Sequence, residues 1–118
     1  MKAPVPILRS FDEAKALEFY RDFLGFEVVF RHRFDPELPL YMGLQHGDCV
    51  LHLSEHHGDA APGATLRIEV PDVAAFCAAL NDKRYGFARP GLQDQPWGAR
   101  ETSIADPFGN RLVFWSPL

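Results

Sequence analysis

The sequence predicts an α+β fold built from two βαβββ modules, and three observations support this. A strand, a helix, further strands and a hairpin follow one another in the same order twice along the 118 residues. A polar, turn-rich segment, residues 55–64, separates the two runs. Half a chain of this length buries too little surface to fold alone. We therefore expect one domain over residues 1–118, with module one at about 1–57 and module two at about 63–118.

The first module begins with a short apolar segment, residues 4–9, bounded by prolines. Proline cannot donate to a ladder, so this segment predicts a strand near a sheet edge. Ser10 and Glu13 have the spacing of a capping box, and a helical period of apolar residues follows as far as Gly25. Strands are expected at 26–31, 40–45 and 49–54, and a turn at 46–48 joins the last two as a hairpin.

The second module repeats this order. Residues 65–70 alternate as a half-buried strand does, and a helix is expected from Pro71-Asp72 to about Lys83. Residues 88–99 are rich in proline and glycine and are expected to be irregular. Strands are expected at 100–106 and 111–116, joined by a tight Asp-Pro-Phe-Gly-Asn turn. Packed side by side, the two modules would form paired curved mixed sheets with helices outside and a concave cleft.

The composition excludes several classes of protein. The chain is 47% hydrophobic and 24% charged, which is a globular balance rather than a disordered one. Its net charge of -4 argues against a nucleic-acid partner, and no apolar run is long enough to span a bilayer. Cys49 and Cys77 form neither a zinc spacing nor a disulfide framework. We therefore expect a cytoplasmic protein with no membrane or nucleic-acid partner.

Strand alternation suggests which polar residues face the cleft. In the strand at 49–54, Leu51 and Leu53 share one face and His52 lies on the other. In the strand at 65–70, Arg67 and Glu69 face away from the apolar side. These three residues are candidates for ligand binding. The alternatives are a structural histidine at His52 and a self-satisfying ion pair at Arg67 and Glu69.

Two tryptophans and a glutamate complete the candidate ligand-binding set. Trp97 lies beside a glycine on an irregular loop, where an aromatic ring can stack on a flat ligand. Glu101 enters the strand that follows, and Trp115 shares a strand face with Arg111 and Val113. The alternative for both tryptophans is packing at a dimer interface.

All five histidines lie between positions 32 and 57, but their spacing is not a recognised ligand pattern. We expect no metal site there and only adventitious metal binding. No serine lies in a nucleophile elbow, and no glycine-rich loop could cradle a phosphate. The sequence therefore assigns no catalytic residue and no cofactor.

Three stretches nevertheless resemble a known group of proteins: AKALEFYRDFLGFEVVF, TLRIEVPDVAAF and QPWGARETSIADPFGNRLVF. Together they resemble the vicinal oxygen chelate superfamily, which includes glyoxalases, bleomycin resistance proteins and dioxygenases. The chain is most similar to the bleomycin-resistance branch, and PWGARETSIADPFGN carries the most specific part of the likeness. The resemblance covers nearly the whole chain, and it implies paired βαβββ modules in a homodimer with clefts shared between subunits.

The same resemblance implies where the metal ligands of the enzymes would lie. The two histidine positions correspond to Val5 and Thr65, and a glutamate position corresponds to Val113. The remaining position falls on or near His52. Valine and threonine cannot replace a histidine or carboxylate ligand here, which argues against enzymatic metal chemistry.

These observations favour a metal-free protein that binds and sequesters a small antibiotic-type, bleomycin-like molecule. The ligand would be aromatic or cationic, because the chain is mildly acidic. One alternative is a metal-dependent lyase, isomerase or dioxygenase of the same superfamily. Another is an interaction module whose cleft is filled by its own side chains.

Overall fold

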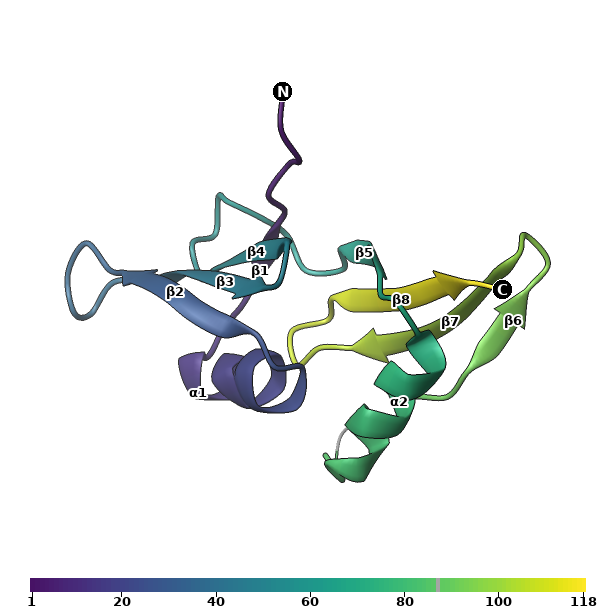
Figure 1. Ribbon diagram of the computed structural model, residues 1–118. Helices are drawn as coiled ribbons and strands as arrows, with labels where there is room; N and C mark the ends of the chain where they lie inside the picture. The colour runs from purple at the N-terminus through teal and green to yellow at the C-terminus, as the bar shows by residue number, and fades with distance from the viewer. Residues whose placement is uncertain (87) are drawn as a thin grey trace. The chain divides into compact units, whose positions relative to one another are not determined.

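Two four-stranded mixed sheets, each accompanied by helix, form the framework of the protein (Figure 1). This computed structural model describes residues 1–86 and 88–118, and the chain divides into two units, Met1–Ala64 and Thr65–Leu118. The predicted α+β class is confirmed. Each unit is described by itself. The cleft between the two sheets therefore stays a prediction, and so does a single domain with the expected module limits. No helix within the described residues is long and apolar enough to cross a membrane.

Both units have the same order of elements and the same strand order. The first unit contains β1 (Ile7–Arg9), α1 (Glu13–Ala16), η1 (Leu17–Phe23), β2 (Glu27–His32), β3 (Tyr41–His46) and β4 (Cys49–Ser54). The second unit contains β5 (Thr65–Glu69), α2 (Val73–Asp82), β6 (Gln93–Gln95), β7 (Ala99–Ala105) and β8 (Arg111–Pro117). The sheets have the orders β1-β4-β3-β2 and β5-β8-β7-β6, and the first strand of each is parallel to its neighbour. This confirms the predicted repeat and the edge position of the first strand.

Helix starts are set by aspartates in both units. The Oδ1 atom of Asp12 accepts a hydrogen bond from the Lys15 amide at 2.9 Å. The predicted capping box at Ser10 is therefore wrong: the Ser10 amide instead donates to the Ser54 carbonyl at 2.9 Å, extending the pairing of β1 with β4. Asp72 caps α2 in the same way, accepting from the Ala75 amide at 3.1 Å, as predicted.

The first helix departs from a regular α period. From Leu17 to Phe23 it winds as a π-helix, and the Leu24 amide donates to the Phe19 carbonyl five residues back. Phe19 and Tyr20 are adjacent in sequence, yet both are buried, with their rings edge to face at 4.9 Å. A strict period of 3.6 residues does not describe a segment that buries neighbouring aromatic side chains.

The segment at 88–99, predicted to be irregular, contains a short strand. β6 pairs with β7 in antiparallel register, with Gln93 opposite Glu101 and Gln95 opposite Ala99. Its three residues are polar and show no alternation, so only pairing with β7 defines the strand. The N-terminal strand is shorter than predicted, because ladder pairing begins at Ile7, after the prolines.

Helix α2 covers one face of the second sheet (Figure 1). The Phe76 ring lies 4.5 Å from the Phe114 ring, centroid to centroid. Val73 and Leu112 are fully buried in this layer. Leu112 and Phe114 therefore lie on the α2 side of the sheet, which leaves the opposite face to Val113 and to polar and aromatic side chains.

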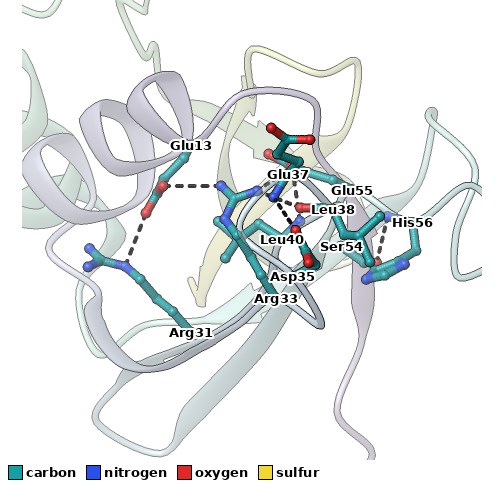
Figure 2. Close-up of polar contacts among 10 residues, drawn as sticks. All are labelled: Glu13, Arg31, Arg33, Asp35, Glu37, Leu38, Leu40, Ser54, Glu55 and His56. Carbon is teal, nitrogen blue, oxygen red and sulfur yellow. Dashed lines mark hydrogen bonds and ion pairs between the residues drawn. The ribbon is translucent and has the colours of Figure 1, made fainter.

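A network of ion pairs surrounds the β2–β3 loop of the first unit (Figure 2). Glu13 on α1 pairs with Arg31 at 3.2 Å and with Arg33 at 3.4 Å. Arg33 also donates to the Leu38 carbonyl at 2.8 Å and approaches Glu55 at 3.8 Å. These groups are partly exposed, so the network positions the loop and contributes little net stability.

Candidate ligand-binding site

The face of the second sheet opposite α2 carries the candidate residues in two cross-strand rows. Cross-strand neighbours in a sheet project to the same side. The ladder register of β5, β8, β7 and β6 aligns Arg67 with Val113 and Ser103, and Glu69 with Trp115, Glu101 and Gln93. Residues that are far apart in the sequence therefore meet on one surface.

This face contains a cavity of about 470 Å³, within the second unit. Its volume lies in the range of roughly 300–1,000 Å³ typical of small-molecule sites. Its polar and aromatic lining comes from β5, β6, β7, β8 and the loop before β7: Arg67, Gln93, Gln95, Trp97, Glu101, Ser103 and Arg111. Three of the six predicted ligand-binding residues are thus brought together.

Glu101 forms hydrogen bonds with two other residues that line this cavity. One of its carboxylate oxygens accepts from the Arg67 guanidinium at 2.8 Å and from the Trp97 indole N–H at 3.2 Å. The hydrogen bond from Arg67 is the largest cause that holds the pKa of Glu101 below its ordinary value, with smaller contributions from Trp97 and the charge of Arg111. Desolvation acts in the opposite direction. Glu101 therefore stays ionised at neutral pH and serves as an anchor rather than a proton donor.

Trp97 presents an aromatic surface at the cavity. It is 64% exposed even though its indole N–H is fixed by Glu101. The chain turns after it at Gly98, whose φ of +88° favours glycine, and the Gly98 amide donates to the Gln95 carbonyl at 3.1 Å. The ring is thus held at one edge while its face remains available to a ligand.

Trp115 and Glu69 lie beside the cavity and do not line it. The Arg67 guanidinium carbon is 5.6 Å from the centroid of the Trp115 ring, a cation–π contact. Trp115 is half-buried, and Glu69, its neighbour in register, is exposed. Trp115 therefore supports Arg67, and Arg67 pairs with Glu101 rather than with Glu69, the partner considered as the alternative to ligand binding.

His52 lies in the first unit, where it is half-buried. Its Nδ1 atom is 2.7 Å from the Tyr41 hydroxyl, and its ring is edge to face with Phe30 at 5.2 Å. Burial is the main cause that raises the pKa of Tyr41, with Asp59 adding to it, so the phenol stays protonated. His52 thus belongs to an aromatic cluster of the first sheet and not to the cavity of the second.

Several residues of both groups were missed from the sequence. Alternation had placed Arg111 on the same strand face as Val113 and Trp115, but it was not selected as a ligand-binding candidate. Gln93 and Gln95 could not be found, because nothing local predicted β6. Phe30 reaches His52 across a register shift between Val28 and Phe30, and no sequence pattern reveals such a bulge.

The residues present do not fit the metal centre that the vicinal oxygen chelate resemblance implies. Within residues 1–86 and 88–118, no group of three or more His, Cys, Asp or Glu side chains could hold a metal ion. Val113 occupies the position of the implied glutamate ligand and contributes an apolar surface to the cavity.

Solved structures with similar folds include proteins that bind antibiotics. A bleomycin resistance determinant encoded on the transposon Tn5 is 27% identical, with a TM-score of 0.76, and the match covers 99% of this chain and 98% of that one. A bleomycin-binding protein complexed with bleomycin is 27% identical, with a TM-score of 0.72 and full coverage of both chains. A glyoxalase/bleomycin resistance protein/dioxygenase superfamily member from Sphaerobacter thermophilus shares the fold at 23% identity, a TM-score of 0.73, and coverage of 98% and 97%.

No curated protein matches the chain. The family profile described as "Glyoxalase superfamily protein" matches residues 1–117, which is nearly the whole chain. This match agrees with the motifs identified in the sequence and with the repeated strand order of the two units. The chain therefore belongs to the glyoxalase superfamily.

Proposed function

We propose that this protein binds and sequesters a small antibiotic-type, bleomycin-like molecule without metal or covalent chemistry. The observation that carries the proposal is the cavity in which Glu101 fixes both Arg67 and Trp97. The two bleomycin-associated structures, each 27% identical over nearly the whole chain, support the same class of function.

Binding would depend on groups that are already in place. The Arg67–Glu101–Trp97 hydrogen bonds hold two side chains in one geometry before a ligand arrives, which reduces the entropy lost on binding. The exposed indole face of Trp97 can stack on a planar ring, and the amides of Gln93 and Gln95 offer hydrogen bonds at the cavity wall. Such a site needs affinity and no catalytic group.

The proposal includes a homodimer. Large apolar side chains are exposed on edge strand β2 and the loop that follows it: Val29, Phe30, Phe34 and Leu38. Exposed apolar side chains on an edge strand favour association with a second surface. Light scattering after size exclusion should give twice the mass of one chain, and a monomer would remove this part of the proposal.

We also propose a cytoplasmic location, which the free thiols Cys49 and Cys77 support.

Calorimetric titration tests the function directly. Tag-free protein treated with a chelator would be titrated with bleomycin and with other antibiotics that contain planar rings. We expect at least one to bind with a Kd of about tens of micromolar or tighter. Trp97→Ala should weaken that binding by about tenfold or more, because it removes the stacking surface.

Phe11→Ala is the matched control. Phe11 is an aromatic residue of the first unit that is 56% exposed and does not line the cavity, so this variant should bind as the wild type does. If no antibiotic of the panel binds at tens of micromolar, the sequestration proposal is wrong. If Trp97→Ala binds as tightly as wild type, the ligand does not use this cavity.

A further inference from the structure

The acidic excess of the chain is confined to the first unit. Residues 1–64 contain six basic and ten acidic side chains, whereas residues 65–118 contain six of each. The net charge of -4 therefore says nothing about the electrostatics of the cavity, which lies in the second unit. The charge that a ligand meets there must be read from the lining residues themselves.

The lining residues give the cavity a positive balance. Two guanidinium groups, Arg67 and Arg111, face one carboxylate, Glu101. The Glu101 oxygen that Arg67 contacts at 2.8 Å also accepts from Trp97, so this carboxylate already balances the charge of Arg67. A cationic ligand would meet Arg111, and Glu101, already paired with Arg67, is the one carboxylate among the residues that line the cavity; like charges in a partly enclosed site repel.

Arg111 is the cation that remains available. It is exposed on β8, and within the described residues no carboxylate forms an ion pair with it. In register it lies opposite Thr65 and Ala105, neither of which carries a charge. A guanidinium fork in this setting matches the two oxygens of a carboxylate or the oxygens of a similar acid.

The remaining lining completes the recognition of a flat molecule. Trp97 offers an exposed ring face, and Val113 offers an apolar floor that is 5% exposed. Resting on the proposed binding function, we propose that the cavity binds a planar aromatic ligand that carries a carboxylate or similar acidic group. Arg111 pairs with the acid and Trp97 stacks on the ring. The ligand class is thus aromatic and anionic, which differs from the cationic ligand that the net charge of the whole chain favours.

Three probes of nearly equal shape test the charge preference: 2-naphthoate, 2-naphthamide and the 2-naphthylmethylammonium ion. In calorimetric titrations of the full chain at neutral pH, we expect naphthoate to bind about tenfold more tightly than the amide, and the cation most weakly. Arg111→Gln should remove the preference for naphthoate over the amide while leaving the affinity for the amide nearly unchanged. The preference should also fall in high salt.

Arg89→Gln is the control variant, because Arg89 is an exposed arginine of the same unit that does not line the cavity. It should keep the full preference for naphthoate, and thermal melting should show that both variants are folded. Equal or tighter binding of the amide or the cation, or a preference that survives Arg111→Gln, would overturn the inference. If an antibiotic binds in the earlier titration while naphthoate does not, the inference fails and the binding function stands.

Discussion

At the residue scale, Glu101 determines the character of the cavity. It is 8% exposed, and it holds Arg67 and Trp97 through a single carboxylate oxygen. Glu101 was identified from the sequence as a candidate, but its pairing with Arg67 was not, because Glu69 is the acidic residue nearer to Arg67 in the sequence. Only the pairing of β8 with both β5 and β7 brings Glu101, rather than Glu69, against the guanidinium.

The lowered pKa of Glu101 predicts a specific acid response. A carboxyl whose pKa is depressed on folding contributes stability that is complete above its ordinary pKa, here 4.5, and is lost as the pH falls through the folded value. The difference in free energy of unfolding between wild type and Glu101→Gln should therefore be constant from about pH 7 to about pH 5 and shrink below that. Urea denaturation at a series of pH values measures it. A difference that stays constant down to about pH 3 would contradict the assignment.

Gly43 allows the aromatic cluster of the first sheet to form. A Cβ at this position would overlap the ring of Phe30, which stacks on Tyr41 at 6.0 Å and contacts His52. We expect Gly43→Ala to destabilise the protein by about 1 kcal/mol, the scale of a displaced aromatic pair. In a Phe30→Ala background the same change should cost almost nothing, since the ring is gone. Equal costs in both backgrounds, measured by urea denaturation, would show that the ring is not the cause.

At the element scale, the sequence predicts strands whose apolar residues alternate and helices that begin with a capping residue. Prediction from sequence fails for elements that are defined only by pairing with a neighbouring strand. The strand at Cys49–Ser54 and the start of α2 at Asp72 agree with the prediction, because alternation and capping are local signals. The β6 strand was missed because three polar residues have no pattern of their own. The same holds for the cavity: Arg67 on β5 and Glu101 on β7 were predicted as ligand-binding residues, whereas Gln93 and Gln95 on β6 were not.

A buried carboxylate organises the β7–β8 turn of the second unit. The buried carboxylate of Asp106 accepts from the Phe108 and Asn110 amides at 2.8 Å each and from the Asn110 side chain at 2.9 Å. Asp106→Ala leaves these donors buried without their acceptor, so we expect a loss of about 2–3 kcal/mol in urea denaturation.

Asp35→Ala is the control for this turn. Asp35 also accepts from a backbone amide, that of Glu37 at 3.2 Å, but it is exposed. Its replacement should cost less than about 0.5 kcal/mol. Equal effects of the two substitutions would show that the buried carboxylate does not organise the turn.

At the scale of the whole molecule, the alternative function, a metal-dependent lyase, isomerase or dioxygenase, predicts a bound metal ion. Such an enzyme needs about one divalent ion per chain. We expect tag-free protein to contain far less than this by elemental analysis, and chelator treatment to leave the melting temperature unchanged. One bound ion per chain, lost together with the histidine in His52→Ala, would favour the enzyme.

The proposal that the second unit contains the binding cavity is tested most directly by a crystal structure of the protein with the tightest ligand from the titrations. The aromatic part of that ligand should lie against the face of Trp97, with its acidic group at Arg111. An ordered ligand bound without contact to either side chain would contradict the proposed site.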